Sequence, residues 1–185
     1  MRARIMIALA LAFSVAACAS NYETTVIQDN RAEPISPDAS LLVAVEGDGS
    51  YIDKIYPGSG NMARRAMVLA LSKYATDVSA IPDFMTAEAA TLNAKAQNAG
   101  YLVYLSILNW EDRATEWSGR PDRIEIAVRL IDGNSGDLLE SKLVKASSKW
   151  ATFGGDHPQD LLKTPFDQYA AGIFGQAPSP VPSGQ

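Results

Sequence analysis

The chain has very little of the chemistry on which metal and disulfide sites depend. Among its 185 residues it carries one cysteine, Cys18, and one histidine, His157. A single cysteine excludes an intramolecular disulfide, and one cysteine with one histidine falls short of the ligand sets of the common zinc sites. We therefore predict no metal and no cofactor, assign no catalytic residue, and expect packing to stabilise the fold.

Positive charge is also scarce. The chain holds 16 Lys and Arg against 21 Asp and Glu, and residues 1–17 contribute two of the arginines and no acid, so the rest carries 14 minus 21, or −7. Binding to nucleic acid depends on clustered Lys and Arg that neutralise phosphates, so we expect no nucleic-acid partner. An acidic surface is not attracted to anionic lipid either, and membrane attachment would need another route.

Long hydrophobic runs are missing as well. The longest predominantly apolar stretch, residues 5–17, follows Arg2 and Arg4. It is too short to span a bilayer, because a spanning helix needs about 20 apolar residues. A basic start, a short apolar run and small residues before a cysteine are typical of a secretory signal. We expect residues 1–17 to be a signal peptide that is removed.

The end of this leader carries a recognisable motif. Val15, Ala16, Ala17 and Cys18 resemble the cleavage site of a bacterial lipoprotein signal. The resemblance implies that Cys18 becomes the mature N-terminus and carries lipid, including palmitate, as a membrane anchor. An aspartate directly after the lipidated cysteine would resemble an inner-membrane retention signal, but this position holds Ala19. We therefore expect the protein to be anchored in the periplasmic leaflet of the outer membrane of a Gram-negative bacterium. A leader that is cut without lipidation is the alternative.

Both ends of the remaining chain are expected to lack regular structure. Residues 18–40 are polar, include Pro34 and Pro37 and show no sustained period, so they predict a lipidated N-terminus followed by a flexible tether. Residues 175–185 combine three prolines with serine and glycine and predict a disordered tail. Residues 41–174 then form a single periplasmic domain of ordinary size.

The apolar period within residues 41–174 alternates between strand-like and helical. Apolar or alternating runs predict strands at residues 41–45, 77–81, 101–108, 124–130 and 138–147. Helical spacing predicts three helices. The first buries Ala63, Ala66, Met67, Ala70, Leu71 and Tyr74; the second, capped by Thr86 and stopped by Gly100, buries Ala89, Leu92, Ala96 and Ala99; the third, opened by Thr164 and Pro165, buries Phe166, Tyr169, Ala170, Ile173 and Phe174.

This order of elements indicates an α/β (α+β) fold. The early alternation of strand and helix, followed by a hairpin in the C-terminal half, predicts a mixed sheet of four or five strands covered by about three helices.

A glycine-rich connection precedes the first predicted helix. It contains Gly47, Gly49, Gly58 and Gly60 at the place where nucleotide-binding folds hold phosphate. It lacks the Gly-Lys-Ser/Thr ending of a phosphate loop, so we expect a turn-rich loop in which Ser59 caps the helix. Weak anion binding at this helix start, near Arg64 and Arg65, is the alternative.

Residues 110–123 hold the densest chemistry, with four acids, three arginines and two tryptophans in fourteen positions. Exposed Trp and Arg are favoured anchors of binding surfaces, whereas Arg-carboxylate pairs with stacked Trp rings make a rigid structural network. Both interpretations stay open. The candidate binding surface comprises Trp110, Glu111, Asp112, Arg113, Glu116, Trp117, Arg120, Asp122 and Arg123, together with Phe153, Asp156 and His157.

The same acids raise the question of catalysis. A pair of carboxylates could hydrolyse an envelope polymer through Glu111, Asp112 or Glu116. The interleaved arginines oppose this, because they favour the charged form of a carboxylate over a proton donor. His157 lacks a poised nucleophile nearby, so we expect it to make local hydrogen bonds in a turn. Whether the protein is an enzyme stays open, with the balance against it.

Two long stretches resemble a bacterial lipoprotein family of unknown function. They read Trp-Glu-Asp-Arg-Ala-Thr-Glu-Trp-Ser-Gly at residues 110–119 and Lys-Trp-Ala-Thr-Phe-Gly-Gly-Asp-His-Pro-Gln-Asp at residues 149–160, and the Tyr-Pro-Gly-Ser-Gly loop at residues 56–60 is a third shared element. The family supplies no activity to carry over. More distantly, the element order is similar to that of the N-terminal domain of the periplasmic Tol protein and of the curli secretion lipoprotein.

We therefore predict a membrane-anchored periplasmic lipoprotein of unknown molecular activity that serves as a binding or assembly module of the cell envelope. Its partners would be the membrane, through the N-terminal lipid, and an envelope protein or cell-wall component. A structural part with no ligand of its own is a further possibility.

Overall fold

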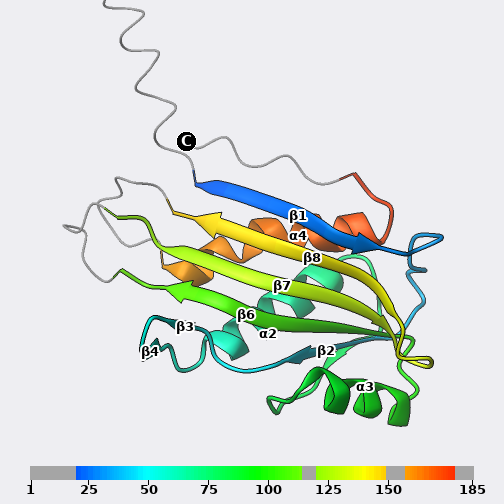
Figure 1. The fold of residues 1–185 in the computed structure, drawn as a ribbon. Coiled ribbons are helices and arrows are strands. Elements are labelled where there is room, and N and C mark those ends of the chain that lie inside the picture. Colours follow the sequence, from blue (N-terminus) through cyan, green and yellow to red (C-terminus); the bar gives the residue numbers. More distant parts are fainter. Residues whose placement is uncertain (1–19, 114–119, 149–156, 178–185) are drawn as a thin grey trace, which may run out of the picture.

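The computed structural model describes residues 20–113, 120–148 and 157–177 of the chain (Figure 1). Several predictions on residues outside these ranges are therefore not addressed by the fold: the signal peptide, Cys18, Glu116, Trp117, Phe153, Asp156 and most of the tail. No described helix is long and apolar enough to cross a membrane.

The core of the fold is a six-stranded mixed sheet in the order β1-β8-β7-β6-β2-β5. Its strands are β1 (Asn21–Asp29), β2 (Leu41–Val45), β5 (Val78–Ala80), β6 (Tyr101–Glu111), β7 (Arg123–Asp132) and β8 (Leu138–Ser147). β2 pairs in parallel with β5 and β6, and the other neighbours are antiparallel. A two-stranded ribbon of β3 (Ser50–Tyr51) and β4 (Lys54–Ile55) stands beside it. The predicted mixed sheet and hairpin are confirmed, with one strand more than expected.

The additional strand is β1, in the segment that the sequence predicts to be a flexible tether. β1 pairs with β8 from Asn21 opposite Ser147 to Asp29 opposite Glu140, at the edge of the sheet. Nearly all its side chains are exposed, so it shows no apolar alternation for a pattern search to find. Its β-branched run of residues 24–27 instead favours extended backbone, and the ladder with β8 supplies the hydrogen bonds.

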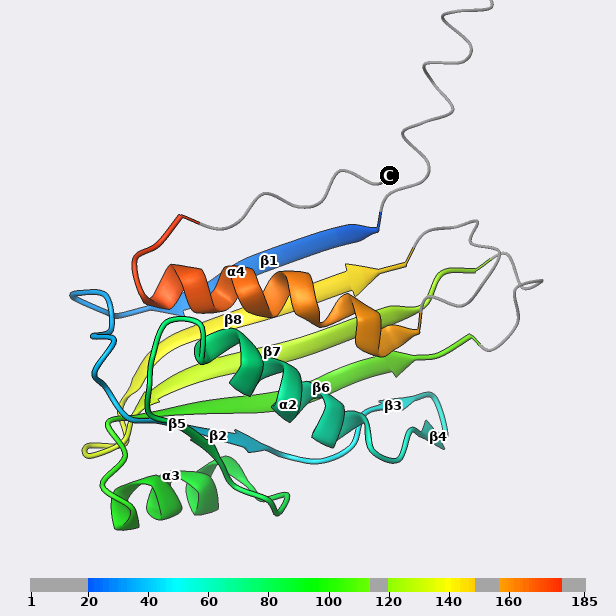
Figure 2. The same ribbon diagram turned by 180° about the vertical axis from the view of Figure 1, so that it is seen from behind.

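Helices cover the two faces of the sheet unequally. α2 (Ser59–Leu71) and α4 (Lys163–Ile173) lie side by side across one face, as Figure 2 shows, and bury the larger hydrophobic core there. α3 (Ala87–Ala96) packs on the other face, in a smaller core with β2, with the first half of β6 and with Ile131 near the end of β7. The rest of that face, formed by β1, β8, most of β7 and the end of β6, carries no described helix (Figure 1). This part is called the open face below.

The second predicted helix is present as α3, but the face predicted to be buried is wrong. α3 buries Ala90 and Ala94, whereas Leu92 is 70% exposed and the predicted Ala89 and Ala96 are exposed too. An alanine-rich helix offers several equivalent faces, and the one without a large side chain lets α3 approach the sheet closely. Thr86 caps the helix as predicted, with its hydroxyl accepting from the amide of Ala89 at 3.3 Å. The left-handed residue after the helix is Asn98 (φ 53°), not Gly100.

The last helix buries the predicted face, with Phe166, Tyr169, Ala170, Ile173 and Phe174 all buried. Its start differs from the prediction. The 3-10 helix η2 (Pro158–Leu161) runs directly into α4, so Leu162 takes the cap position and Thr164 lies inside the first turn. A preceding 3-10 turn already supplies backbone acceptors, and a side-chain cap is not needed.

Candidate functional site

Two rows of polar side chains cross the open face at the end of the sheet where β1 begins. The strand register places Asn21, Ser147, Arg123 and Glu111 in one row and Glu23, Lys145, Glu125 and Asn109 in the next. Residues two apart on a strand share a face, so both rows point to the same side. With Tyr51 of β3 they line a depression of about 340 Å³, called the groove below.

Some charges of the groove are neutralised within the protein. Glu111 is 2% exposed and forms an ion pair with Arg113. The Arg113 guanidinium also donates to the Tyr51 hydroxyl at 3.2 Å and lies 5.5 Å from the centre of its ring. Glu125 pairs with Lys145 at 3.3 Å. These contacts hold the side chains of Glu111, Tyr51 and Glu125 in place within the groove.

Other polar groups of the groove are available. Glu23 and Arg123 are exposed and Asn109 is half-buried, and the side chains of these three residues have no hydrogen-bond or ion-pair partner among the described residues. A carboxylate, a guanidinium and an amide can together bind a polar ligand through charge-assisted and neutral hydrogen bonds. The groove is therefore suited to binding a polar surface or molecule.

The predicted surface of residues 110–123 is only partly a surface. Trp110 is 2% exposed within the main core, and Asp122 is 7% exposed. Asp122 accepts from the amide of Arg113 at 2.6 Å, and its own amide donates to the Ser148 hydroxyl at 2.9 Å. Both residues therefore lie beneath the surface. There Asp122, which directly precedes β7, links the residues that follow β6 and β8.

The remaining described members of the predicted surface are accessible. Arg120 is exposed, and Asp112 and Arg113 are half-buried. The backbone carbonyl of Asp112 accepts from the Tyr56 hydroxyl at 3.4 Å. Exposed His157 lies at the start of η2, where its amide donates to the Asp160 carboxylate at 3.0 Å. The structure thus shows His157 in a local capping arrangement.

The glycine-rich loop is a structural turn. Ser59 does not cap α2; its hydroxyl instead accepts from the amide of Gly49 at 2.8 Å and donates to the carbonyl of Tyr56 at 2.7 Å. The Asp48 carboxylate accepts from the amide of Gly60 at 2.9 Å, so a protein side chain already occupies the helix start. Arg64 donates to the carbonyls of residues 81 and 82. Among the described residues, the Gly60 amide and the Arg64 guanidinium are thus already bonded within the protein.

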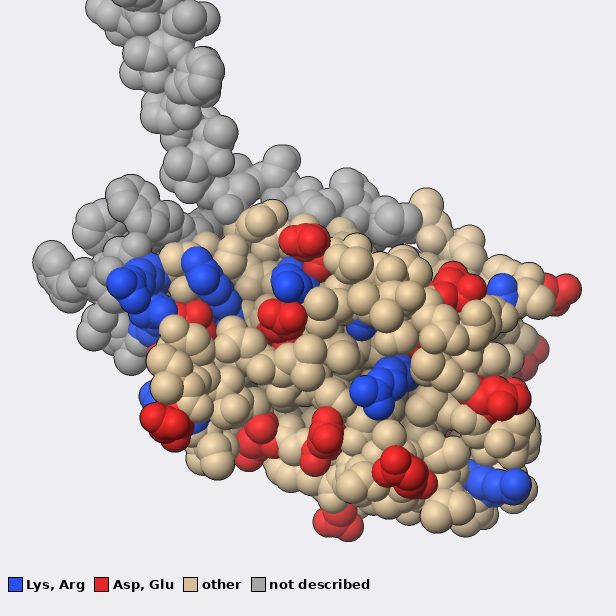
Figure 3. Space-filling view, in the orientation of Figure 1, with Lys and Arg blue, Asp and Glu red and all other residues tan. Residues whose placement is uncertain are grey.

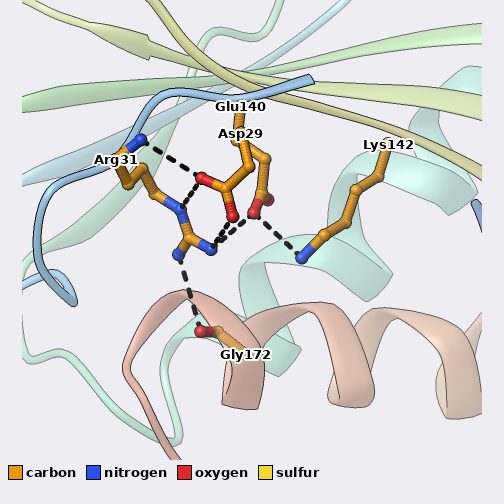
Figure 4. Close-up of polar contacts among 5 residues, drawn as sticks. All are labelled: Asp29, Arg31, Glu140, Lys142 and Gly172. Carbon is orange, nitrogen blue, oxygen red and sulfur yellow. Dashed lines mark hydrogen bonds and ion pairs between the residues drawn. The ribbon is translucent and has the colours of Figure 1, made fainter. Parts of the chain in front are cut away.

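A second polar region lies under β1 on the helix-covered face. Here Asp29, Arg31, Glu140 and Lys142 form the charge cluster shown in Figure 4. Glu140 is fully buried, and its Oε2 lies 2.6 Å from the Arg31 guanidinium and 3.0 Å from Lys142 Nζ. Arg31 also pairs with Asp29 at 3.1 Å and contacts the carbonyl of Gly172 at the end of α4.

The charge cluster is closed by the helix above it. The hydrogen bond from Arg31 lowers the pKa of Asp29. Burial, reinforced by the charge of Glu140, raises the pKa of Tyr169 on α4 well above 10, and Lys142 Nζ lies 5.3 Å from the centre of that ring. A buried pair of this kind is costly to break, because one partner is left charged and unpaired. The charge cluster thus fastens β1 to β8 and α4.

The surface predicted from the sequence contained only two of the eleven residues that line the groove. It included Glu111 and Arg123 but not Asn21, Glu23 or Tyr51, because the first two were assigned to a tether and the third to a loop. Only the strand pairing brings them together. Within the described ranges, no group of His, Cys, Asp and Glu could hold a metal ion.

Comparison with known proteins gives a family and a fold. The family model described as Domain of unknown function (DUF4823) matches residues 33–173. The PelC dodecamer from Paraburkholderia phytofirmans is similar at a TM-score of 0.62 and 17% identity, covering 87% of this chain and 100% of that one. Protein XCC0632 from Xanthomonas campestris, of family DUF330, is similar at a TM-score of 0.52 and 12% identity, covering 83% and 93%. No curated protein matches the chain.

Proposed function

Because the chain belongs to the DUF4823 family, whose function is unknown, we propose its role from its own residues: it is a lipid-anchored binding or assembly module of the bacterial cell envelope. Cys18 carries the lipid and holds the domain at the periplasmic leaflet of the outer membrane. The observation that carries this proposal is the Val-Ala-Ala-Cys motif at residues 15–18, which ends a leader too short to span a bilayer.

Two features of the domain support a binding or assembly role. The groove offers Glu23, Arg123 and Asn109 to a partner, which would be an envelope protein or a cell-wall component. The similar PelC structure is a dodecamer, so this fold is able to build assemblies. At 17% identity the likeness is one of fold, and assembly of this chain is part of the proposal.

A hydrolase is less well supported. Hydrolysis of a glycosidic bond needs two suitably spaced carboxyl groups facing one pocket. Of the three glutamates that line the groove, Glu111 pairs with Arg113 and Glu125 with Lys145, which leaves Glu23 alone. The described residues therefore favour binding over acid-base chemistry.

The anchor is tested by replacing Cys18 with serine. We expect the wild-type protein to sediment with outer membranes and its N-terminal peptide to show the mass of a lipidated cysteine, and Cys18→Ser to lose both. Membrane attachment that survives the substitution would contradict the anchor.

The groove is tested by crosslinking in cells with a photoreactive residue at position 109. The matched control carries it at position 141, also half-buried and on the open face. We expect a specific adduct from position 109 only. Adducts of equal yield from both positions, or from neither, would count against a groove partner.

A further inference from the structure

The folded domain begins very close to the proposed lipid. Asn21, the first residue of β1, follows Cys18 by three residues. Whatever path the chain takes, three residues reach at most about 11 Å. The polar region on each side of a bilayer is itself about 5–8 Å thick. A lipid on Cys18 therefore leaves the start of β1 at the outer limit of the headgroups, without the tether expected from the sequence.

The start of β1 also defines one end of the sheet. Because neighbouring strands are antiparallel, it lies beside the end of β8 at Ser147, the start of β7 at Arg123 and the end of β6 at Glu111. The turn between β7 and β8 lies at the other end (Figure 1). The nine residues of β1 span about 30 Å, so the two ends are well separated.

The distribution of charge distinguishes the two ends. Figure 3 shows Lys and Arg side chains concentrated toward the end where β1 begins, while Asp and Glu line the lower edge of the same view. Arg120, Arg123 and Lys145 are exposed at the first end, beside exposed Glu23 and half-buried Glu125, whereas its Glu111 and Asp122 are buried. Without residues 1–17 the chain has a net charge of 14 minus 21, or −7, and it approaches an anionic surface most favourably through such a basic region.

From these observations we propose that the end of the sheet where β1 begins lies against the phospholipid headgroups, with Arg123 contacting lipid phosphates and the groove opening at the membrane surface. This proposal rests on the lipidation of Cys18 in the proposed function. The strands then run away from the bilayer, and α3 and the β7–β8 turn face the periplasm.

The orientation is measured with two matched labels on β8. Ser147 and Ser141 lie on the same strand and the same face, both are half-buried, and they are about 20 Å apart along the strand. Lipidation consumes the thiol of Cys18, the only native cysteine, so Ser147→Cys or Ser141→Cys supplies the single reactive thiol. The lipidated full chain, labelled there with a fluorophore, is reconstituted into vesicles that contain phospholipid with a spin-labelled headgroup.

We expect quenching at position 147 to be several-fold stronger than at position 141, and lowest for Asn134→Cys in the β7–β8 turn. Glu23→Cys and Gln28→Cys, both exposed on β1, repeat the comparison if a substitution on β8 prevents folding. Equal quenching along the strand, or stronger quenching at position 141, overturns the orientation. Lipid on Cys18 with equal quenching refutes this proposal alone, whereas an N-terminal peptide without lipid refutes the proposed function and this proposal together.

Discussion

The groove and the charge cluster lie on opposite faces of the same strands and use the same residue types, but they differ in what covers them. In the charge cluster, α4 covers Glu140, and the Glu140 carboxylate pairs with both Arg31 and Lys142. In the groove, Glu23 and Arg123 are exposed and have no partner among the described residues. Covered charges must find their partners inside the protein, whereas exposed charges stay hydrated and can exchange that water for a ligand. The charge cluster therefore holds the fold, and the groove is free to bind.

The largest difference should appear when an arginine is removed from each region. Arg31→Met leaves Glu140 buried with Lys142 as its remaining cation, and we expect the free energy of unfolding to fall by about 3 kcal/mol. Arg123→Met in the groove should change it by less than about 0.5 kcal/mol. Urea denaturation of both variants measures the difference. Similar losses in the two would mean that the charge cluster does not hold the fold.

A substitution at Gly49, next to β3 and packed against β6, should have the next largest effect on stability. A Cβ at Gly49 would lie 2.6 Å from Cγ2 of Ile107 and 2.7 Å from Cβ of Trp110. We expect Gly49→Ala to cost about 1–3 kcal/mol through overpacking and to displace β3 with Tyr51. At Gly47 a Cβ meets nothing within 4 Å, so Gly47→Ala is the control. Thermal unfolding that is equal for the two variants would contradict the packing against β6.

Two buried tyrosines should respond in opposite directions when their hydroxyls are removed. The Tyr169 hydroxyl, over the charge cluster, has no hydrogen-bond partner among the described residues, whereas the Tyr104 hydroxyl donates to the carbonyl of Met85 at 2.9 Å. We expect Tyr169→Phe to stabilise the protein by about 1 kcal/mol, because it removes an unsatisfied buried group. Tyr104→Phe should destabilise it by about 1 kcal/mol. A loss of stability in both variants would show that the Tyr169 hydroxyl is bonded.

The smallest effect concerns acid. The pKa of Asp29 is lowered by the hydrogen bond from Arg31, so its contribution to stability is present above the unfolded value of about 3.9 and is lost as the pH falls through the lower folded value. Asp29→Asn should therefore show a shallower loss of stability below about pH 4 than the wild type. Glu23→Gln, which removes an exposed carboxyl group of the groove, is the control variant. Urea denaturation at a series of pH values from neutral to acidic measures how the free energy of unfolding of each variant depends on pH. Equal slopes for the two variants would mean that Asp29 does not contribute to the loss of stability in acid.

Prediction from the sequence succeeded where one face of an element is buried and the other is wet. β7 alternates buried Ile124, Ile126, Val128 and Leu130 with half-buried Glu125, Ala127 and Arg129, and α4 buries every residue predicted for its inner face. It failed at β1, whose side chains are exposed on both faces, and at α3, whose alanines look alike on every side. An apolar period reports burial of side chains and contains no signal for a strand that is held through its backbone.

The candidate site shows the same division. The concentration of Trp, Arg and acid in residues 110–123 led us to predict a binding surface there, and two of its residues, Glu111 and Arg123, line the groove. The sequence could not indicate that Trp110 lies in the core, or that Asn21 and Glu23 lie beside residues more than 100 positions later. Pairing between distant segments is set by the sheet register, which local patterns do not encode.

The sequence by itself determined the mixed sheet, its C-terminal hairpin and the buried face of the last helix, and it predicts a leader at residues 1–17 that precedes Cys18. Each depends on a period or motif within one short segment. Only the tertiary structure decided that β1 joins the sheet three residues after Cys18, that Glu140 meets Arg31 beneath it, and that one face stays open over the groove. These features depend on which distant segments cover one another, because burial and charge pairing are properties of the folded neighbourhood.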